Sequence, residues 1–517
     1  MNSAVTSLFT FLLFTGQALI GLELPTFFGD HMVLQRDKPI AIWGSTNPET
    51  DVIVTFGGEE WKTVSDSQGK WRVAIDPQTA SAQERDLKIE SGEVSHIFEG
   101  VLVGEVWFAS GQSNMGWNLK DTEDAEAEIA AVGVRPIRLF QTTVTPAATP
   151  KQDVYGNWRR CSPDSVGRWP AVAYYFARYL EEDLQVPVGI IHASSGGVPV
   201  ESFISKDGFL ALPEGRDIAS NLEKSLVMAR LKEIRQAYDK DMREWIQQSA
   251  NQDGGNESGE RSARPEIPKD LTSSTGLPMA FFNGMIHPFT GYSLRGFIWY
   301  QGEANAKPWR AQHYAKSFSL MINDWRTHWN ELLPFVWVQL ASYEDPHQQP
   351  GKTGPWTILQ NEQRRVLSLP NTGMVVANDL GDGENIHPPK KREVGRRLSL
   401  WALQNIYGEP VVGSGPLFRE VSIEGNLVRV HFDSASSLKT RNEEELKGFE
   451  IAGEDRIWHD ADSVIDGDTV LASSPNVPSP VAVRYAWESN PLDANLVNGA
   501  GLPASIFQSS DWPYDVN

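Results

Sequence analysis

The sequence predicts a doubly wound α/β domain flanked on each side by a region of β structure. In the middle of the chain, uniformly apolar runs alternate with longer amphipathic segments, as in a parallel sheet covered by helices on both faces. Nearer both ends, short apolar runs are separated by turn residues. A chain of 517 residues has room for roughly three domains of about 150 residues each.

Residues 1–21 have the pattern of an export signal. Leu8 to Ile20 is mostly apolar, is too short to span a bilayer, and is followed by small residues. No Lys or Arg precedes this run, which leaves an uncleaved anchor or a mis-set start codon open. We expect an exported protein, periplasmic or extracellular, without membrane insertion once the signal is removed.

Residues 22–100 are predicted to form a small antiparallel β-sandwich. Their apolar runs lie at 39–44, 51–58 and 70–75, with a turn at 66–69. Residues 411–517 are predicted to form a second β-rich domain. The β-type runs there lie at 427–432, 448–453, 468–473 and 482–487.

The α/β domain is assigned to residues 101–410. Its candidate strands are 101–110, 186–194, 294–302, 333–342 and 373–381. Its candidate helices, with apolar residues at three- and four-residue spacing, are 171–184, 313–329, 356–369 and 390–406. Residues 222–248 are also helical in pattern, and the polar segment at about 248–275 is predicted to be an exposed, mobile insertion.

The charge balance and the cysteine content exclude several partners. The chain has 46 Lys and Arg against 67 Asp and Glu, a formal net charge of -21, which disfavours nucleic acid and anionic membranes as partners. Cys161 is the only cysteine, so neither an intrachain disulfide nor a cysteine zinc cluster can form, and we expect a small buried residue there. The sequence does not indicate an oligomeric state.

The strongest local signal is the turn that holds Ser113. An apolar strand runs into Gly-Gln-Ser-Asn, which places Ser113 between Gln112 and Asn114 at the carboxyl end of a strand, where open α/β sheets bind ligands. A serine there lies near a helix N-terminus, whose N–H groups favour a developing oxyanion. The local spacing equally fits a simple helix N-cap.

Two further polar loops follow predicted strands. Gly196 and Gly197 permit close backbone approach by a ligand, although a tight turn explains them as well. Gln301, Glu303 and Asn305 are crowded into one loop, where amide groups can donate to an oxyanion or can simply be loop residues.

His387 lies in a fourth loop, just before a basic helix. A serine nucleophile needs a base with a pKa near neutrality, and imidazole is the usual choice. The acidic residues Asp379, Asp382 and Glu384 precede it, and any of them can orient the ring. A lone loop histidine is usually only solvated, but the four loops all follow strands of one predicted sheet, which favours a shared site.

The motifs GQSNM, SSGGVPVES, FIWYQGEAN and NIHPPKKREVGRRL, in this order, resemble those of the sialate O-acetylesterases and related carbohydrate acetylesterases of the SGNH hydrolase superfamily. The stretches LPTFFGDHMVLQRDKPIAIWG, FEIAGEDRIW and VRYAWESNP resemble the same proteins, so the likeness covers nearly the whole chain. The resemblance implies a flavodoxin-like, three-layer α/β domain flanked by β domains. It also implies hydrolysis of acetyl esters on sugars through an acyl-enzyme, without metal or organic cofactor.

The resemblance also implies roles for single residues. Ser113 matches the nucleophile and His387 the base. The Gly196-Gly197 pair matches the loop that lends an N–H group to the oxyanion hole, and Gln301 matches a polar side chain in that hole.

The acid of the triad is less clear. The superfamily commonly has Asp three residues before the histidine, where this chain has Glu384. Asp382 and a backbone carbonyl are the alternatives. The neighbouring polar residues Gln112, Asn114, Glu303 and Asn305 are expected to bind the substrate.

Other functions stay open at this point. The substrate is an O-acetylated sialic acid or, alternatively, xylan, pectin or another plant or algal glycan. A carbohydrate-binding protein on an inactive hydrolase fold is the alternative from another class.

The charged residues also allow other roles. A metal hydrolase using Asp379, Asp382 and His387 is disfavoured because the spacing matches no standard zinc pattern. Basic residues that can meet a substrate carboxylate are Arg295, Lys390, Lys391 and Arg392, of which the last three are more simply a solvated helix start.

Overall fold

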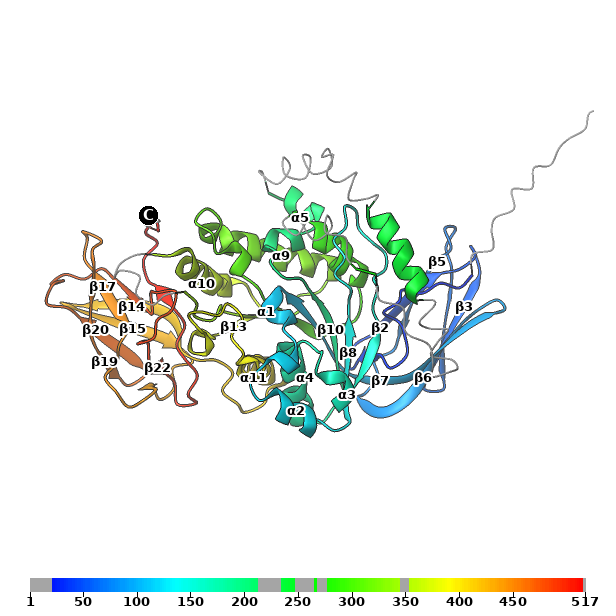
Figure 1. Cartoon of the computed structure of the whole chain (residues 1–517), viewed down its shortest axis with the longest axis horizontal. Helices are drawn as coiled ribbons and strands as arrows, with labels where there is room; N and C mark the ends of the chain where they lie inside the picture. The colour runs from blue at the N-terminus through cyan, green and yellow to red at the C-terminus, as the bar shows by residue number, and fades with distance from the viewer. Residues whose placement is uncertain (1–20, 213–233, 247–264, 267–276, 345–352, 515–517) are drawn as a thin grey trace, which may run out of the picture.

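The computed structural model describes residues 21–212, 234–246, 265–266, 277–344 and 353–514. Three regions follow one another along its long axis, an N-terminal β region, a central α/β domain and a C-terminal β region (Figure 1). The predicted signal segment and nearly all of the predicted insertion lie outside the described residues, so export and the insertion stay predictions. In the described part, no helix is long and apolar enough to cross a membrane.

The centre of the molecule is a parallel sheet in the order β13-β12-β11-β7-β10-β8, with β9 antiparallel at one edge. The strands are β7 (Val94–Gly111), β8 (Arg135–Gln141), β9 (Trp158–Cys161), β10 (Val188–Ser194), β11 (Gly296–Tyr300), β12 (Phe335–Val338) and β13 (Thr372–Val375). All five predicted apolar runs are strands of this sheet. Strand β8 was missed, because Pro136 and the arginines at 135 and 138 interrupt its apolar run.

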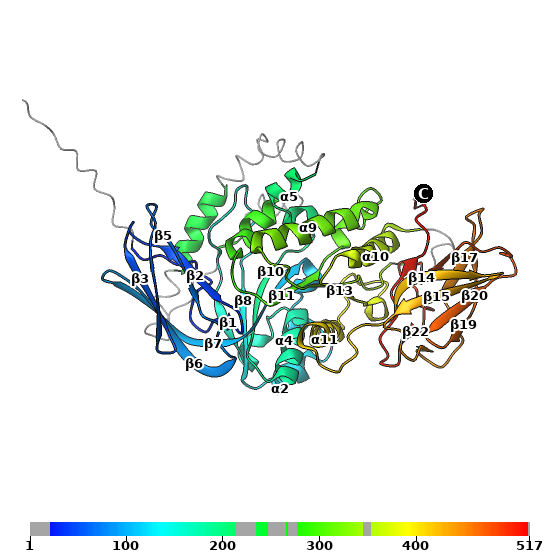
Figure 2. The same cartoon turned by 180° about the vertical axis from the view of Figure 1, so that it is seen from behind.

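Helices cover both faces of this sheet (Figures 1 and 2). On one face α4 (Ala171–Leu184) packs against α11 (Lys391–Ala402), and on the other lie α9 (Tyr314–Trp329) and α10 (Pro355–Arg365). Each matches a predicted amphipathic segment, and residues 234–246 of the predicted fifth segment are helical too. The doubly wound architecture is therefore confirmed.

The N-terminal β region is continuous with the central sheet through β7. Its other strands are β1 (Val33–Gln35), β2 (Ile40–Ser45), β3 (Asp51–Phe56), β4 (Glu59–Val64), β5 (Lys70–Ile75) and β6 (Ser81–Ser91). The first half of β7 pairs antiparallel with β6, and its second half pairs in parallel with β10 and β11. The residues of β7 are exposed or half-buried before residue 100 and all buried from residue 100 onward. The predicted domain boundary at residues 100 and 101 therefore falls within one continuous strand.

The C-terminal β region has a hydrophobic core of its own, which includes Val430, Ile451, Tyr485 and Phe507. Its sheets are β14-β15-β20-β19, β18-β17-β21-β23 and β16-β22. The strands are β14 (Leu417–Glu424), β15 (Leu427–Asp433), β16 (Lys439–Thr440), β17 (Phe449–Ala452), β18 (Trp458–Asp460), β19 (Asp462–Asp466), β20 (Thr469–Ser473), β21 (Ala482–Tyr485), β22 (Leu496–Val497) and β23 (Phe507–Gln508). All four β-type runs predicted here are strands.

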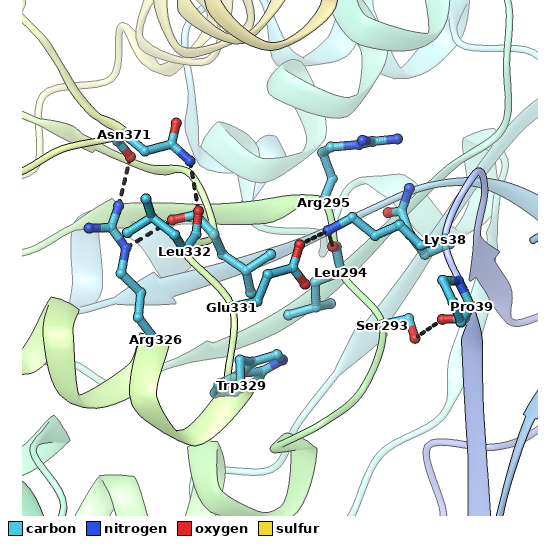
Figure 3. A network of polar contacts seen from close by, with 12 residues as sticks. Lys38, Pro39, Ser293, Leu294, Arg295, Arg326, Trp329, Glu331, Leu332 and Asn371 are labelled. Atoms are coloured by element: carbon cyan, nitrogen blue, oxygen red, sulfur yellow. Dashed lines mark hydrogen bonds and ion pairs between the residues drawn. The ribbon is translucent and has the colours of Figure 1, made fainter.

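Polar contacts fasten the N-terminal region to the amino ends of the central strands (Figure 3). Lys38 donates to the carbonyl oxygen of Leu294 over 3.0 Å and pairs with Glu331. Close by, the fully buried carboxylate of Glu105 on β7 accepts hydrogen bonds from Arg36 and Arg295. Burial acts to raise the pKa of Glu105, but the two guanidinium groups outweigh it and lower the pKa.

Replacing Glu105 tests this anchor. Glu105→Gln leaves two partly buried guanidinium groups without their counter-charge, so we expect the free energy of unfolding to fall by about 3–5 kcal/mol. Because the folded-state pKa is lowered, the stabilisation is present above the unfolded pKa and is lost as the pH falls through the folded value. Urea titrations of wild type and variant at several pH values measure both effects.

Glu331→Gln is the matched control, since this carboxylate is 49% exposed in its pair with Lys38. A pair of that kind contributes about 0–1 kcal/mol. Equal losses in the two variants would contradict a special role for the buried carboxylate.

Candidate active site

Four loops meet at the carboxyl edge of the central sheet. Ser113 is the first residue of the short helix α1 (Ser113–Gly116), directly after β7. The Gly196-Gly197 loop follows β10, the short helix η5 (Glu303–Asn305) follows β11, and the loop of His387 follows β13 and η8 (Asn378–Leu380). The prediction that these loops all follow strands of one sheet is confirmed.

The hydroxyl of Ser113 and the imidazole of His387 face each other. His387 Nε2 lies 2.7 Å from Ser113 Oγ, although 274 positions separate the residues in the chain. The imidazole ring stacks on the indole of Trp117, with ring centroids 4.6 Å apart and planes tilted by 13°. Burial and, secondly, the charge of Lys391 lower the pKa of His387, so the ring is neutral near pH 7. A neutral imidazole at this distance can remove the hydroxyl proton.

The predicted carboxylate partner is absent from this arrangement. Glu384 and Asp382 are both exposed, and Asp382 accepts instead from the backbone N–H of Glu384. Within the described residues, no hydrogen bond or ion pair joins either carboxylate to the imidazole of His387. The expectation that one of them orients the ring is not supported by this geometry, which shows a pair rather than a triad.

The glycine loop after β10 lies beside Ser113. A Cβ placed on Gly196 would be 3.6 Å from Ser113 Cβ, so the glycine loop runs next to the serine. Gly196 and Gly197 are exposed, and the φ of Gly197 is 69°, a value that favours glycine. In the described part of the chain, the N–H groups of Ser113 and Gly196 have no acceptor. Both are free to meet an oxyanion.

The prediction that Gln301 donates into the oxyanion hole is wrong. Its side chain is fully buried, and Nε2 donates to the carbonyl oxygen of Val198 over 3.1 Å and to Asn305 Oδ1 over 2.8 Å. Both amide hydrogens are used, and Oε1 accepts from the hydroxyl of Tyr314. Gln301 therefore holds the loop together.

Asn305 belongs to the same buried network rather than to a substrate surface. Its Nδ2 donates to the carboxylate of Glu201 over 3.0 and 3.2 Å. Its Oδ1 accepts from the backbone N–H of Val200 as well as from Gln301. With every hydrogen-bonding position filled and no exposed surface, Asn305 has nothing to offer a ligand.

Gln301→Met tests the assignment of Gln301. The apolar side chain leaves the Val198 carbonyl without its donor and removes one partner each from Asn305 and Tyr314. We therefore expect a loss of about 1–3 kcal/mol of stability for an unsatisfied buried group. Chemical denaturation measures this loss, and kcat is measured on the folded protein. A wild-type stability together with a loss of about 100–1000-fold in kcat would restore the oxyanion role.

Asn114 and Glu303 were predicted to bind substrate, but they form a buried polar cluster with Lys391. Asn114 Nδ2 donates to Glu303 Oε1, and Asn114 Oδ1 accepts from Lys391 Nζ over 2.5 Å. Lys391 is fully buried, so its predicted place at a solvated helix start is wrong. Gln112 is buried too, and its Oε1 accepts from the backbone N–H of Ala304.

The remaining charged candidates lie elsewhere or are engaged. Arg295 directly precedes β11, at the amino end of the sheet, where it pairs with Glu105 rather than facing the site. Arg392 pairs with Glu128. Lys390 is exposed.

The geometry also bears on the metal alternative. Asp379 makes a two-pronged ion pair with Arg397, with N–O distances of 2.6 and 2.7 Å. Among the described residues, no three His, Cys, Asp or Glu side chains are grouped so that they can hold a metal ion.

Trp117 was not singled out from the sequence. It lies four positions after Ser113, in the segment that begins with the GQSNM motif. Nothing in the spacing indicates that the imidazole of His387, from a distant loop, stacks on it. Lys391 was named, but the pair Lys390-Lys391 gives no signal of which lysine faces the interior.

Comparison with known proteins gives consistent matches. Residues 282–404 match the family described as carbohydrate esterase, sialic acid-specific acetylesterase. A sialate O-acetylesterase of Rattus norvegicus is 28% identical over 525 residues, covering 92% of this chain and 91% of the relative. The Homo sapiens sialate O-acetylesterase is 26% identical, covering 92% and 89%. A crystal structure of a carbohydrate acetylesterase from Xanthomonas citri is 32% identical, with a TM-score of 0.79, and covers 95% of this chain and 100% of that chain.

These matches define first a class, the carboxylic ester hydrolases, with an α/β sheet and additional β regions. Within that class, the chain belongs to the sialate O-acetylesterase family of carbohydrate esterases.

Proposed function

We propose that this chain hydrolyses O-acetyl esters on carbohydrates through an acetyl-serine intermediate, with Ser113 as the nucleophile and His387 as the base. The observation that carries the proposal is the distance of 2.7 Å between Ser113 Oγ and His387 Nε2 at the carboxyl edge of the sheet. The acetyl group and the sugar are supported by the names of the related enzymes from Rattus norvegicus and Xanthomonas citri.

The reaction follows from where charge develops. His387 removes the proton as Ser113 Oγ bonds to the acetyl carbonyl carbon, and the N–H groups of Ser113 and Gly196 stabilise the oxyanion. The intermediate collapses, the ester bond to the sugar oxygen breaks, and this oxygen leaves with the proton from His387. Water then attacks the acetyl-serine with His387 as its base, which releases acetate and restores the hydroxyl.

The strand order supports an SGNH-type, flavodoxin-like assignment of the central domain. Without its edge strands β8 and β9, the sheet reads β10-β7-β11-β12-β13, which is the order 2-1-3-4-5 in the chain. Flavodoxin-like folds have this order and bind ligands where the strand order reverses. Here that point is the carboxyl end of β7, directly before Ser113.

We infer that an O-acetylated sialic acid is the substrate, because the family description and the curated relatives name this sugar. Acetate release is measured with O-acetylated sialic acids and, in parallel, with acetylated xylan and pectin oligosaccharides. Faster release from the sialic acids is the expected result. A preference for the plant oligosaccharides would overturn the sialate assignment and leave the esterase chemistry intact.

Ser113→Ala tests the nucleophile. With the hydroxyl gone, we expect release of p-nitrophenol from its acetate to fall to background, a loss on the order of 10⁶-fold in kcat. Wild-type circular dichroism and thermal unfolding show that the variant is folded.

Ser194→Ala is the matched control, because Ser194 Oγ also lies close to a histidine, 2.9 Å from His192 Nε2. Both residues are buried, and burial lowers the pKa of His192 to about 3. We expect this variant to keep most of the activity. The reverse pattern, an active Ser113→Ala and an inactive Ser194→Ala, would assign the chemistry to the second pair.

The pH profile tests the base. Only a neutral imidazole can accept the proton, and burial and Lys391 lower the pKa of His387 below its usual 6.5. We therefore expect kcat/KM to be constant near neutrality and to fall only below a kinetic pKa that is lower than 6.5. A kinetic pKa above 6.5 would indicate a carboxylate partner that stabilises the imidazolium.

A further inference from the structure

Asn114 links the immediate neighbours of the two reacting residues. It follows Ser113 in α1, and its Nδ2 donates over 2.9 Å to the carbonyl oxygen of Ile386, the residue before His387. The same nitrogen donates to Glu303 Oε1 on η5. One amide therefore connects the serine loop, the histidine loop and the loop after β11.

Lys391 sets the orientation of that amide. Its Nζ donates to Asn114 Oδ1 over 2.5 Å, which directs Nδ2 toward Ile386 and Glu303. Lys391 is fully buried, and Asn114 and Glu303 are 2% and 6% exposed. Burying a charge is costly unless the charge is paired or hydrogen-bonded. An exposed residue at the start of this helix would not carry that cost. The fold thus retains a costly buried amine one hydrogen bond away from Asn114, the residue after Ser113.

We propose that Lys391 is the positioning residue of this esterase: through Asn114 it fixes the serine loop against the histidine loop. The proposal rests on the proposed serine mechanism. It also accounts for the arrangement of a Ser–His pair that no carboxylate orients in the described structure.

The charges around Lys391 agree with this role. Glu303 is the acidic group that faces it, the ring of Tyr300 lies 5.5 Å from Nζ, and His387 is the nearby base whose pKa it lowers. Burial lowers the pKa of Lys391 to about 7, against the opposing charge of Glu303. Lys391 therefore carries its charge in acidic solution, and this charge contributes to the lowered pKa of His387.

A series of variants at Lys391 separates the two effects. Lys391→Arg keeps charge and donor, Lys391→Gln keeps a donor only, and Lys391→Met keeps neither. Loss of the donor, in Lys391→Met, is expected to lower kcat by about a hundredfold with little change in KM. This is the effect expected when the reacting groups are misplaced by about 1 Å. Loss of the charge is expected to move the acidic limb of kcat/KM to higher pH, because the charge that lowers the pKa of His387 is gone.

Lys390→Met is the matched control, since Lys390 is the exposed neighbour on the same helix start. We expect it to keep the kcat and the pH profile of the wild type. If Lys391→Met fails to fold, Lys391→Gln still tests the charge through the shift of the acidic limb.

Two results would overturn the proposal. One is a Lys391→Met enzyme with the wild-type kcat and acidic limb. The other is a loss of activity in which the acidic limb stays in place for both the Gln and the Met variant, which would leave Lys391 a merely structural role. An active Ser113→Ala enzyme, in contrast, would refute the serine mechanism itself, so the two failures are distinguishable.

Discussion

The parallel register of β7 with its two neighbours is the constraint on which the site depends. Gly111, the last residue of β7, is level with Ser194 of β10 and with Tyr300 of β11, so the loops that follow the three strands share one edge. A Cβ on Gly111 would lie 2.1 Å from the carbonyl oxygen of Tyr300, and the φ of 136° suits only glycine. Any larger residue at position 111 would push β7 and β11 apart. The hydroxyl of Ser113, directly after β7, would then no longer meet the imidazole of His387 in the loop after β13.

Burial on both faces explains which elements the sequence predicts. The central strands are apolar at nearly every position, and their helices repeat apolar residues with a helical period, so both patterns are strong. Strand β8 carries Arg135, Pro136 and Arg138 near the sheet edge, where Arg138 pairs with Glu84 of the N-terminal region. Such a strand has no local signal, because its charges are compensated by residues far away in the chain.

Within the site, it was easier to predict which residues are present than whether their side chains face the solvent or the interior. The motifs identified Ser113 and His387, since a serine after a buried strand and a histidine in a polar loop have few equivalents in the chain. The sequence predicts Gln301 in the oxyanion hole and Lys391 at a solvated helix start, yet both side chains are fully buried. A polar residue after a strand gives the same pattern whether it faces solvent or closes an internal hydrogen-bond network. Only the partners, which come from other loops, distinguish the two cases.

Packing rather than charge orients the imidazole of His387. A carboxylate would raise its pKa and stabilise the imidazolium, whereas here burial and Lys391 lower the pKa. The face of Trp117 restricts the tilt of the ring, and an aromatic face attracts a cation by about 0.5–2 kcal/mol. In the proposed mechanism this attraction acts only after the proton has been transferred to His387, so it would favour the transition state over the resting state. In the proposed mechanism His387 is therefore a weaker base than the histidine of a carboxylate triad, but it stays unprotonated at a lower pH.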